Sequence, residues 1–467
     1  MRHTGLLVVL AAACSDSTPS VYRTSPLYAD GAHLRDEQGR VAILRGINAR
    51  VGGVFDVTFS DGRMPLEPIP ELTAADCRRM RALGLDLLRL PINWSGIEPM
   101  RDVFDEGYLA RVDAAIACAA DAGMFVVVDL HQDAYSKEIG EDGAPLWAIQ
   151  PPPQMLLEGP LTDLGTRRLS EQVRKAFQTF FQPDDASGLQ AEFSAMLAHV
   201  AGRYADHPAV IGFELFNEPD AGTIEVDAFH ARAAAAVRAA APDKLVFFEP
   251  SALRNFTDFL PTPKEPFPIE GAVYSPHVYT FVFQTDPRAF QSATPEILEP
   301  SVRAAREEAA AFQTPLWIGE FGIGPSTDPQ HDLWMRTQQQ LHDRYFASNA
   351  FWLWKEHSQA SWGVHAYDAN TGAWTERPQV VGWISRVHAV RIAGTPKRLE
   401  SSALGDSLTL ELEAGSAVGA PTQIYVPERF RATTRATCDG AEIVLAGDPA
   451  TGIADVACSG VLFVSPR

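Results

Sequence analysis

The sequence predicts an α/β protein, a (β/α)8 TIM barrel followed by a C-terminal antiparallel β-sandwich. The first observation is that eight short apolar runs alternate with helical stretches between residues 41 and 354. Continuously apolar runs are typical of parallel strands buried on both faces, and eight such repeats favour a closed barrel. The second observation is that long helices stop after residue 390, where short strand-like segments follow.

These patterns divide the chain into four parts. We expect a signal segment over residues 1–14, a Ser/Thr/Pro-rich tether over 15–30, a catalytic barrel over 31–388 and a sandwich over 390–467.

Each barrel strand is expected at one apolar run. The runs are Val41–Ile47, Leu87–Ile92, Phe125–Leu130, Val210–Phe216, Leu245–Glu249, Ala272–His277, Leu316–Glu320 and Ala350–Trp354. The Ala- and Leu-rich stretches between them predict helices, at Ala74–Leu83, Tyr108–Ala122, Phe193–Tyr204, Val226–Ala240, Ser301–Ala311 and Leu333–Phe346.

A long insertion, residues 133–190, follows the third strand and is rich in Pro, Gly and aromatic residues. Loops of this length in a compact domain are usually functional or disordered. Because the loops after barrel strands lie on the catalytic face, we expect a lid or substrate wall here. Its apolar surface could come from Leu156, Leu157, Phe180 and Phe181.

Composition excludes several classes of partner. The chain has 467 residues, 46% of them hydrophobic, and a formal net charge of −20. Nucleic-acid binding needs a basic surface, so it is disfavoured, as is docking on anionic lipid by charge alone. No apolar run approaches the roughly 20 residues that span a bilayer.

The N-terminus has the pattern of an export signal. A basic start precedes the apolar run Leu6–Ala13, and Cys14 follows three alanines. This pattern resembles a bacterial lipoprotein signal, which would make Cys14 the lipidated first residue of an exported, membrane-anchored protein. The alternative is a plain secretory signal in which Cys14 is incidental.

Four cysteines remain after Cys14, an even number that suggests disulfides in an exported chain. Cys438 and Cys458 flank a short strand-like stretch and are expected to pair. Cys77 and Cys118 lie on successive predicted helices and could either bridge them or remain buried free thiols.

Ionisable and aromatic residues gather where the predicted strands end. Two of them, Glu218 and Glu320, end strands four and seven, which lie on opposite sides of a closing barrel. Glycoside hydrolysis requires such a pair, one carboxyl protonated to act as acid and the other ionised. Singly, a strand-end glutamate such as Glu249 is more often structural, and we leave Glu249 out of the expected site.

Several motifs resemble the retaining glycosidases of glycoside hydrolase family five. They are Asn217-Glu218-Pro219 and Gly319-Glu320-Phe321-Gly322, with Arg89, His131, His277, Tyr279 and Trp354. Three further segments resemble the endoglycoceramidases and endo-β-galactosylceramidases of that family: Leu44–Val51, Asp129–Tyr135 and Gly143–Ala148.

The resemblance implies a role for each matching residue. Glu218 is the acid/base, and Glu320 is the nucleophile that forms a glycosyl-enzyme ester. The implied substrate-binding residues are Asn217 at the sugar 2-hydroxyl, Arg89 and Tyr279 at the nucleophile, His131 and His277 around the first sugar, Asp133 at sugar hydroxyls, and Trp354 as a stacking platform. Trp352 lies two residues before Trp354, and the two could exchange roles.

Structural roles are the alternative for the supporting residues. Both histidines could be core residues bonded to backbone, Arg89 could be a buried ion-pair partner, and Trp352 and Trp354 could be packing residues.

The leading expectation is a β-glycosidase that separates a glycan from ceramide or a similar lipid by double displacement. One alternative is a β-glucanase or β-mannanase acting on soluble polysaccharide, and another is a non-catalytic glycan-binding protein on the same scaffold. No metal-binding spacing is present among the 12 histidines, and this chemistry needs no cofactor. We expect a monomer whose partner is a glycolipid or glycan.

Overall fold

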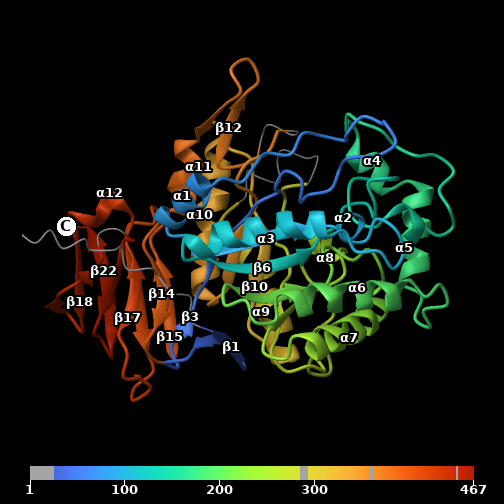
Figure 1. Cartoon of the computed structure of the whole chain (residues 1–467). Helices are drawn as coiled ribbons and strands as arrows, with labels where there is room; N and C mark the ends of the chain where they lie inside the picture. Colours follow the sequence, from blue (N-terminus) through green and yellow to red (C-terminus); the bar gives the residue numbers. More distant parts are fainter. Residues whose placement is uncertain (1–25, 284–292, 358–361, 449–450, 467) are drawn as a thin grey trace, which may run out of the picture.

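The computed structural model describes residues 26–283, 293–357, 362–448 and 451–466. The chain forms a barrel with a β-sandwich at one end and the segment inserted after the third barrel strand at the other (Figure 1). The expected signal segment with Cys14, and the expected tether as far as residue 25, lie outside the described residues. Among the described helices, none is both long and apolar enough to cross a membrane.

Eight parallel strands form the predicted barrel. Their order in the sheet is β10-β11-β4-β5-β6-β7-β8-β9. Parallel bridges from Tyr274 to Leu316 and from Val278 to Phe321 join the two ends of this sheet. The strands are β4 (Arg45–Asn48), β5 (Leu87–Ile92), β6 (Phe125–Leu130), β7 (Val210–Glu214), β8 (Leu245–Phe248), β9 (Ala272–Tyr274), β10 (Trp317–Phe321) and β11 (Ser348–Phe351).

Helices surround the barrel, and the six predicted ones are present with ends shifted by up to six residues. They are α1 (Ala74–Ala82), α3 (Glu106–Asp121), α6 (Leu189–Arg203), α7 (Thr223–Ala240), α9 (Pro295–Phe312) and α10 (Pro329–Arg344). Shorter helices follow some strands: α2 (Trp94–Ile97), α8 (Arg254–Thr257) and α11 (Pro378–Ile384). A hairpin of β12 (His365–Asp368) and β13 (Ala373–Glu376) precedes α11.

Two antiparallel sheets form the sandwich. One contains β14 (His388–Ile392), β17 (Thr422–Tyr425), β20 (Ala446–Gly447) and β21 (Ile453–Val456). The other contains β15 (Pro396–Ser401), β16 (Leu408–Leu412), β18 (Thr434–Cys438), β19 (Ala441–Ile443) and β22 (Val461–Pro466). One helical turn, α12 (Glu428–Arg431), lies between β17 and β18.

The start of the chain belongs to the sandwich, which corrects the predicted boundary. Strands β1 (Leu27–Asp30), β2 (His33–Asp36) and β3 (Val41–Ala42) extend the sheet of β14. The single strand predicted at Val41–Ile47 is therefore two strands in two sheets. Val41 and Ile43 are buried in the sandwich core, whereas Ile47 is buried in the barrel core. The apolar run does not show where the chain passes from the sandwich to the barrel, because both halves of the run are buried.

The insertion after β6 is a folded, partly helical segment. It contains η1 (Leu146–Ala148), α4 (Leu164–Arg168) and α5 (Glu171–Phe180). Phe180 and Phe181 are 0% and 2% exposed and pack against Phe216 and Phe229 of the barrel layer. The expectation that these two rings form a substrate wall is therefore wrong. They secure the insertion to the core instead.

Two disulfides join the four cysteines of the described chain. Cys77 of α1 bonds Cys118 of α3, with Cα atoms 6.0 Å apart, and Cys438 bonds Cys458 with Cα atoms 5.6 Å apart. The expected pairing of Cys438 with Cys458 is confirmed, and of the two alternatives left open for Cys77 and Cys118 the structure contains the bridge.

Candidate active site

Arg89 of β5 lies at the centre of the barrel's carboxyl end and is 0% exposed. Its guanidinium contacts side chains from five other strands or the loops that follow them. These contacts are Asn48 at 3.0 Å, Asp129 at 3.0 Å, Glu214 at 2.5 Å, Asn217 at 2.8 Å, Glu249 at 3.3 Å and Glu320 at 2.6 Å. One buried cation thus links the ends of its own strand and five others, and it partly neutralises four acids.

Glu320 accepts two side-chain hydrogen bonds, one at each carboxylate oxygen. Arg89 Nη1 donates to Oε1 at 2.6 Å, and the Tyr279 hydroxyl donates to Oε2 at 2.9 Å. The carboxylate is 7% exposed, so it reaches the surface of the site while remaining mostly desolvated. A carboxylate that is oriented by two donors and still reaches the site has the geometry of a nucleophile.

Glu218 lies across the site from Glu320. Its backbone adopts a left-handed conformation (φ 42°), a strained geometry common at functional sites. Burial would raise the pKa of Glu218, but the hydrogen bond and charge of His277, followed by the charges of Arg168 and His131, lower it to about 2. Asn255 Nδ2 on α8 also donates to Oε1 at 2.7 Å. These contacts favour the ionised form of Glu218.

His277 bridges the two glutamates. Nδ1 lies 2.9 Å from Glu218 Oε1 and 3.6 Å from Glu320 Oε2, and Nε2 lies 3.3 Å from Glu249 Oε1. Burial would lower the pKa of His277, but the carboxylates of Glu249 and Glu320 and its hydrogen bonds to Glu218 and Glu249 hold it well above its ordinary value. Oxygen atoms of Glu218 and Glu320 lie within 4.8 Å of each other, which matches the short carboxyl separation of retaining glycosidases, roughly 5 Å.

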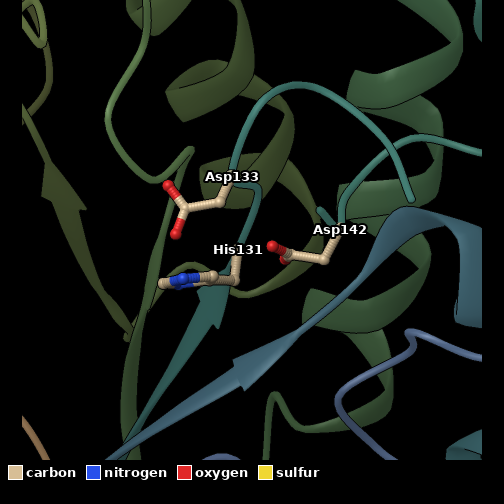
Figure 2. A group of neighbouring side chains, drawn as sticks. All are labelled: His131, Asp133 and Asp142. Carbon is tan, nitrogen blue, oxygen red and sulfur yellow. The ribbon is translucent and has the colours of Figure 1, made fainter. Parts of the chain in front are cut away.

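His131, Asp133 and Asp142 form a second group beside the glutamates (Figure 2). His131 directly follows β6, and the two carboxylates lie on the loop segments beyond it. Asp129 contacts His131 Nδ1 at 2.6 Å and, with burial opposing it, raises the pKa of His131 to about 10. Asn93 Nδ2 donates to Asp142 at 2.5 Å, and burial raises the pKa of Asp142 to about 8.

Two tryptophans that follow β11 differ in exposure. This difference favours Trp352 over Trp354 as the ring that stacks on the sugar. Trp354 is 2% exposed and its indole N–H donates to Asp76 of α1 at 3.0 Å. Its ring is therefore enclosed by protein. Trp352 is half-buried and stacks on His131 with ring centroids 5.7 Å apart and planes 11° apart.

Several residues of this site were not expected from the sequence. Glu249 contacts Arg89 and His277, and its carboxylate accepts from the backbone N–H of Glu218 at 3.1 Å. Burial raises the pKa of Glu249 to about 8, against the opposing charges of His277 and Arg89. Arg168 of α4 and Glu214 inside β7 also contact site residues. Glu214 stands in an apolar run, which is a signal for a buried ion-pair partner, whereas no local pattern identifies Arg168.

Some of these groups have the composition of metal sites. Each of two groups contains three possible ligand atoms that lie within 4.8 Å of one another. The first group is His131, Asp133 and Asp142, and the second is Glu218, His277 and Glu320. In both groups the residues already have protein partners of complementary charge or hydrogen-bonding type, including Asp129, Arg168, Asn93 and Arg89. The arrangement therefore has the chemistry of proton transfer and nucleophilic attack, with the carboxylates stabilised by protein cations.

A barrel with two opposed glutamates at its carboxyl end defines the class of glycoside hydrolases. The sequence matches the family Cellulase (glycosyl hydrolase family 5) over residues 63–358. The chain belongs to this family of glycoside hydrolases, as its motifs indicated.

Individual relatives give a finer comparison than the family as a whole. Endoglycoceramidase I of Rhodococcus hoagii (strain 103S) is 27% identical over 328 residues, covering 64% of this chain and 63% of that protein. The chain therefore spans slightly less than two thirds of that relative. A glucosylceramidase of Cryptococcus neoformans var. grubii is 26% identical over 261 residues, covering 43% of this chain and 34% of that protein.

Two solved structures resemble the whole architecture. An endogalactoceramidase has a TM-score of 0.78 and 26% identity, covering 95% of this chain and 100% of that one. Endo-glycoceramidase II from Rhodococcus sp., solved as a lactosyl-enzyme intermediate, has a TM-score of 0.74 and 25% identity, covering 93% of this chain and 100% of that one.

Proposed function

We propose that this enzyme hydrolyses the bond between a β-linked glycan and ceramide, or a similar lipid, with retention of configuration. Glu320 attacks the anomeric carbon while protonated Glu218 gives its proton to the departing lipid oxygen. Ionised Glu218 then takes a proton from the water that cleaves the glycosyl–Glu320 ester. The pair of glutamates within 4.8 Å supports this double displacement.

The other residues position sugar and charge. Arg89 and Tyr279 donate to Glu320 and would orient its carboxylate for attack. Asn217 is held between Arg89 and the backbone carbonyl of Gln132, where it would bind the sugar 2-hydroxyl. His131, His277 and Asp133 would orient the first sugar, and we now assign the stacking platform to Trp352.

The observation that carries the lipid assignment is an exposed apolar surface beside the acid/base. Asn255 of α8 bonds Glu218, and the next residue, Phe256, is 72% exposed. Leu253 and Phe259 are 56% and 62% exposed on the same short segment. Because Glu218 protonates the leaving group, this surface adjoins the part of the substrate that departs. A ceramide could bury this surface against its acyl chain.

The insertion adds a second apolar surface. Leu146, Trp147, Ile149, Leu156 and three prolines line a groove there. Met155 and Leu156 are 64% and 41% exposed. These residues replace Phe180 and Phe181 as the apolar part of the insertion that can meet an acyl chain.

A direct test compares a glycosylceramide with a cellulose oligosaccharide and identifies the products by mass. We expect faster turnover of the glycolipid and release of free ceramide. The Phe256→Ser variant should lose rate on the glycolipid and keep its rate on a soluble aryl glycoside. Val444→Ser, at an equally exposed position of the sandwich (81%), is the matched control. Faster turnover of the oligosaccharide would favour the soluble-polysaccharide alternative.

The nucleophile has its own test. Glu320→Gln should lower kcat more than about 10⁴-fold while sugar binding persists. Retained turnover in this variant would refute the assignment of Glu320. Absence of any turnover by the unaltered protein would favour the non-catalytic alternative.

We also propose that the protein is an exported bacterial monomer, attached to a membrane through a lipid on Cys14. The N-terminal motif supports the anchor, and the two disulfides fit an oxidising compartment. Labelling with a radioactive fatty acid tests it, because a Cys14→Ser chain that still carried label would exclude Cys14. Sedimentation at the mass of one chain tests the monomer.

A further inference from the structure

Arg168, the last residue of α4, extends from the insertion to the catalytic glutamate. One guanidinium nitrogen forms an ion pair with Asp133 Oδ1, and Nη1 lies 3.6 Å from Glu218 Oε2. The side chain of Arg168 is 38% exposed, whereas those of Asp133 and Glu218 are 17% and 12% exposed. Arg168 therefore covers these two carboxylates from the solvent side.

The segment that carries Arg168 is tied to the loop after β6. Arg167 Nε donates to Asp163 at 2.9 Å, and Arg167 Nη1 donates to the carbonyl oxygen of Gly140 at 3.4 Å. Neighbouring arginines thus have separate tasks. Arg167 fastens α4 to the loop, and Arg168 meets the carboxylates.

We propose that Arg168 is a positioning residue that holds Glu218 in its ionised, general-base form and competes with the sugar for Asp133. This inference rests on the proposed acid/base role of Glu218. A cation within about 4–6 Å of a carboxyl group favours its charged form. Glu218 needs that form when it accepts a proton from water, and it needs the protonated form when the lipid departs. Arg168 therefore assists the second step and opposes the first.

The sugar can resolve this conflict. Asp133 is expected to accept hydrogen bonds from sugar hydroxyls, yet Arg168 donates to one of its oxygens. A sugar that binds Asp133 displaces Arg168 from that oxygen and lets the guanidinium move away from Glu218. Glu218 then takes up the proton that the first step requires. Arg168 thus couples the binding of the sugar at Asp133 to the protonation of Glu218.

Other groups also act on Glu218, and one of them, Asp133, is itself paired with Arg168. They are His277 and Tyr279 after β9, Glu320 on β10, Glu249 after β8, Asn255 on α8, and His131 and Asp133 after β6. The shift expected in an Arg168 variant is therefore the net effect of losing the cation beside Glu218 and the partner of Asp133.

The test is the pH dependence of kcat/KM on an aryl β-glycoside with a poor leaving group, which needs the acid but no lipid specificity. The alkaline limb of this profile reports the acid/base carboxyl in the free enzyme. In Arg168→Gln we expect this limb to move to higher pH by about one unit, because a neighbouring cation is lost. Arg168→Lys should restore most of the original profile.

Arg167→Gln is the matched control, since it loosens α4 without removing the charge beside Glu218. A dinitrophenyl glycoside, whose leaving group needs no proton, should show no Arg168-dependent shift. A purely structural role would lower the rate on both substrates at every pH and leave the limb in place. An unmoved limb, or one moved to lower pH, would overturn the proposal for Arg168. An unaltered protein inactive on all glycosides would instead overturn the proposed function.

Discussion

Arg89 Nη1 donates to Glu320 Oε1 at 2.6 Å, at a point where both side chains are almost fully enclosed. The same guanidinium contacts Asp129, Glu214 and Glu249. Arg89 thus performs two tasks, since it orients the carboxylate of Glu320 and it compensates acids that could not otherwise be buried together.

Replacement of Arg89 by methionine should therefore affect stability and activity together. We expect the free energy of unfolding to fall by about 3–5 kcal/mol, because buried carboxylates lose their common cation. Urea unfolding measures this loss. Arg89→Lys retains the charge but not the forked geometry, so it should recover stability better than activity. Equal recovery of both would contradict a separate role at Glu320.

Trp352 and Trp354 are expected to respond differently to substitution. Trp352→Ala removes the half-buried ring that stacks on His131, so kcat/KM should fall about tenfold or more with little change in melting temperature. Trp354→Phe removes the enclosed indole that donates to Asp76, so stability should fall instead. Kinetics and thermal unfolding of both variants decide the assignment, and the reverse pattern would restore the platform to Trp354.

Asp343 on α10 joins the barrel to the sandwich. It is fully buried and accepts from Arg45 of β4 at 2.6 Å, from Arg386 at 2.5 Å and from Ser401 of β15 at 2.6 Å. Although burial alone would raise its pKa, the two guanidinium groups hold the pKa of Asp343 well below its ordinary value. Asp343→Asn should cost about 3–5 kcal/mol at neutral pH, measured by urea unfolding.

The ion pairs of Asp343 with Arg45 and Arg386 predict that the free energy of unfolding depends on pH. A carboxyl with a depressed folded pKa contributes its stability above its unfolded pKa, near 3.9, and loses it as the pH falls further. Unfolding free energies at pH 7 and pH 3 should therefore differ less in Asp343→Asn than in the unaltered protein. An equal difference in both would assign the acid sensitivity to other carboxylates.

The disulfide between Cys77 and Cys118 closes a loop with a sequence separation of 41, against 20 for Cys438 and Cys458. Replacing Cys77 and Cys118 by serine should cost about 3–4 kcal/mol, because the unfolded chain regains conformational freedom. The Cys438→Ser/Cys458→Ser pair is the control and should cost somewhat less. Denaturant unfolding compares the two, and thiol titration confirms which pair is lost.

Much of the barrel was predictable because its signals are local. The runs Leu87–Ile92 and Phe125–Leu130 are buried at every position, and they match β5 and β6 residue for residue. Glu218 and Glu320 were found by their place at strand ends, since all parallel strands of a barrel deliver their carboxyl ends to one face. Helix α5 was missed, although Val173, Ala176, Phe177 and Phe180 follow the helical spacing of a buried face.

The sequence alone determined the fold class, the cysteine pairs to consider, the two glutamates and the resemblance to family five, because these depend on periodicity and short motifs. The tertiary structure decided which of two tryptophans is exposed, that Phe180 and Phe181 are core, and that β1–β3 join the sandwich. It also brought Arg168 to Glu218, 50 positions away in the chain. Burial and pairing between distant residues are set by packing, and no local pattern records them.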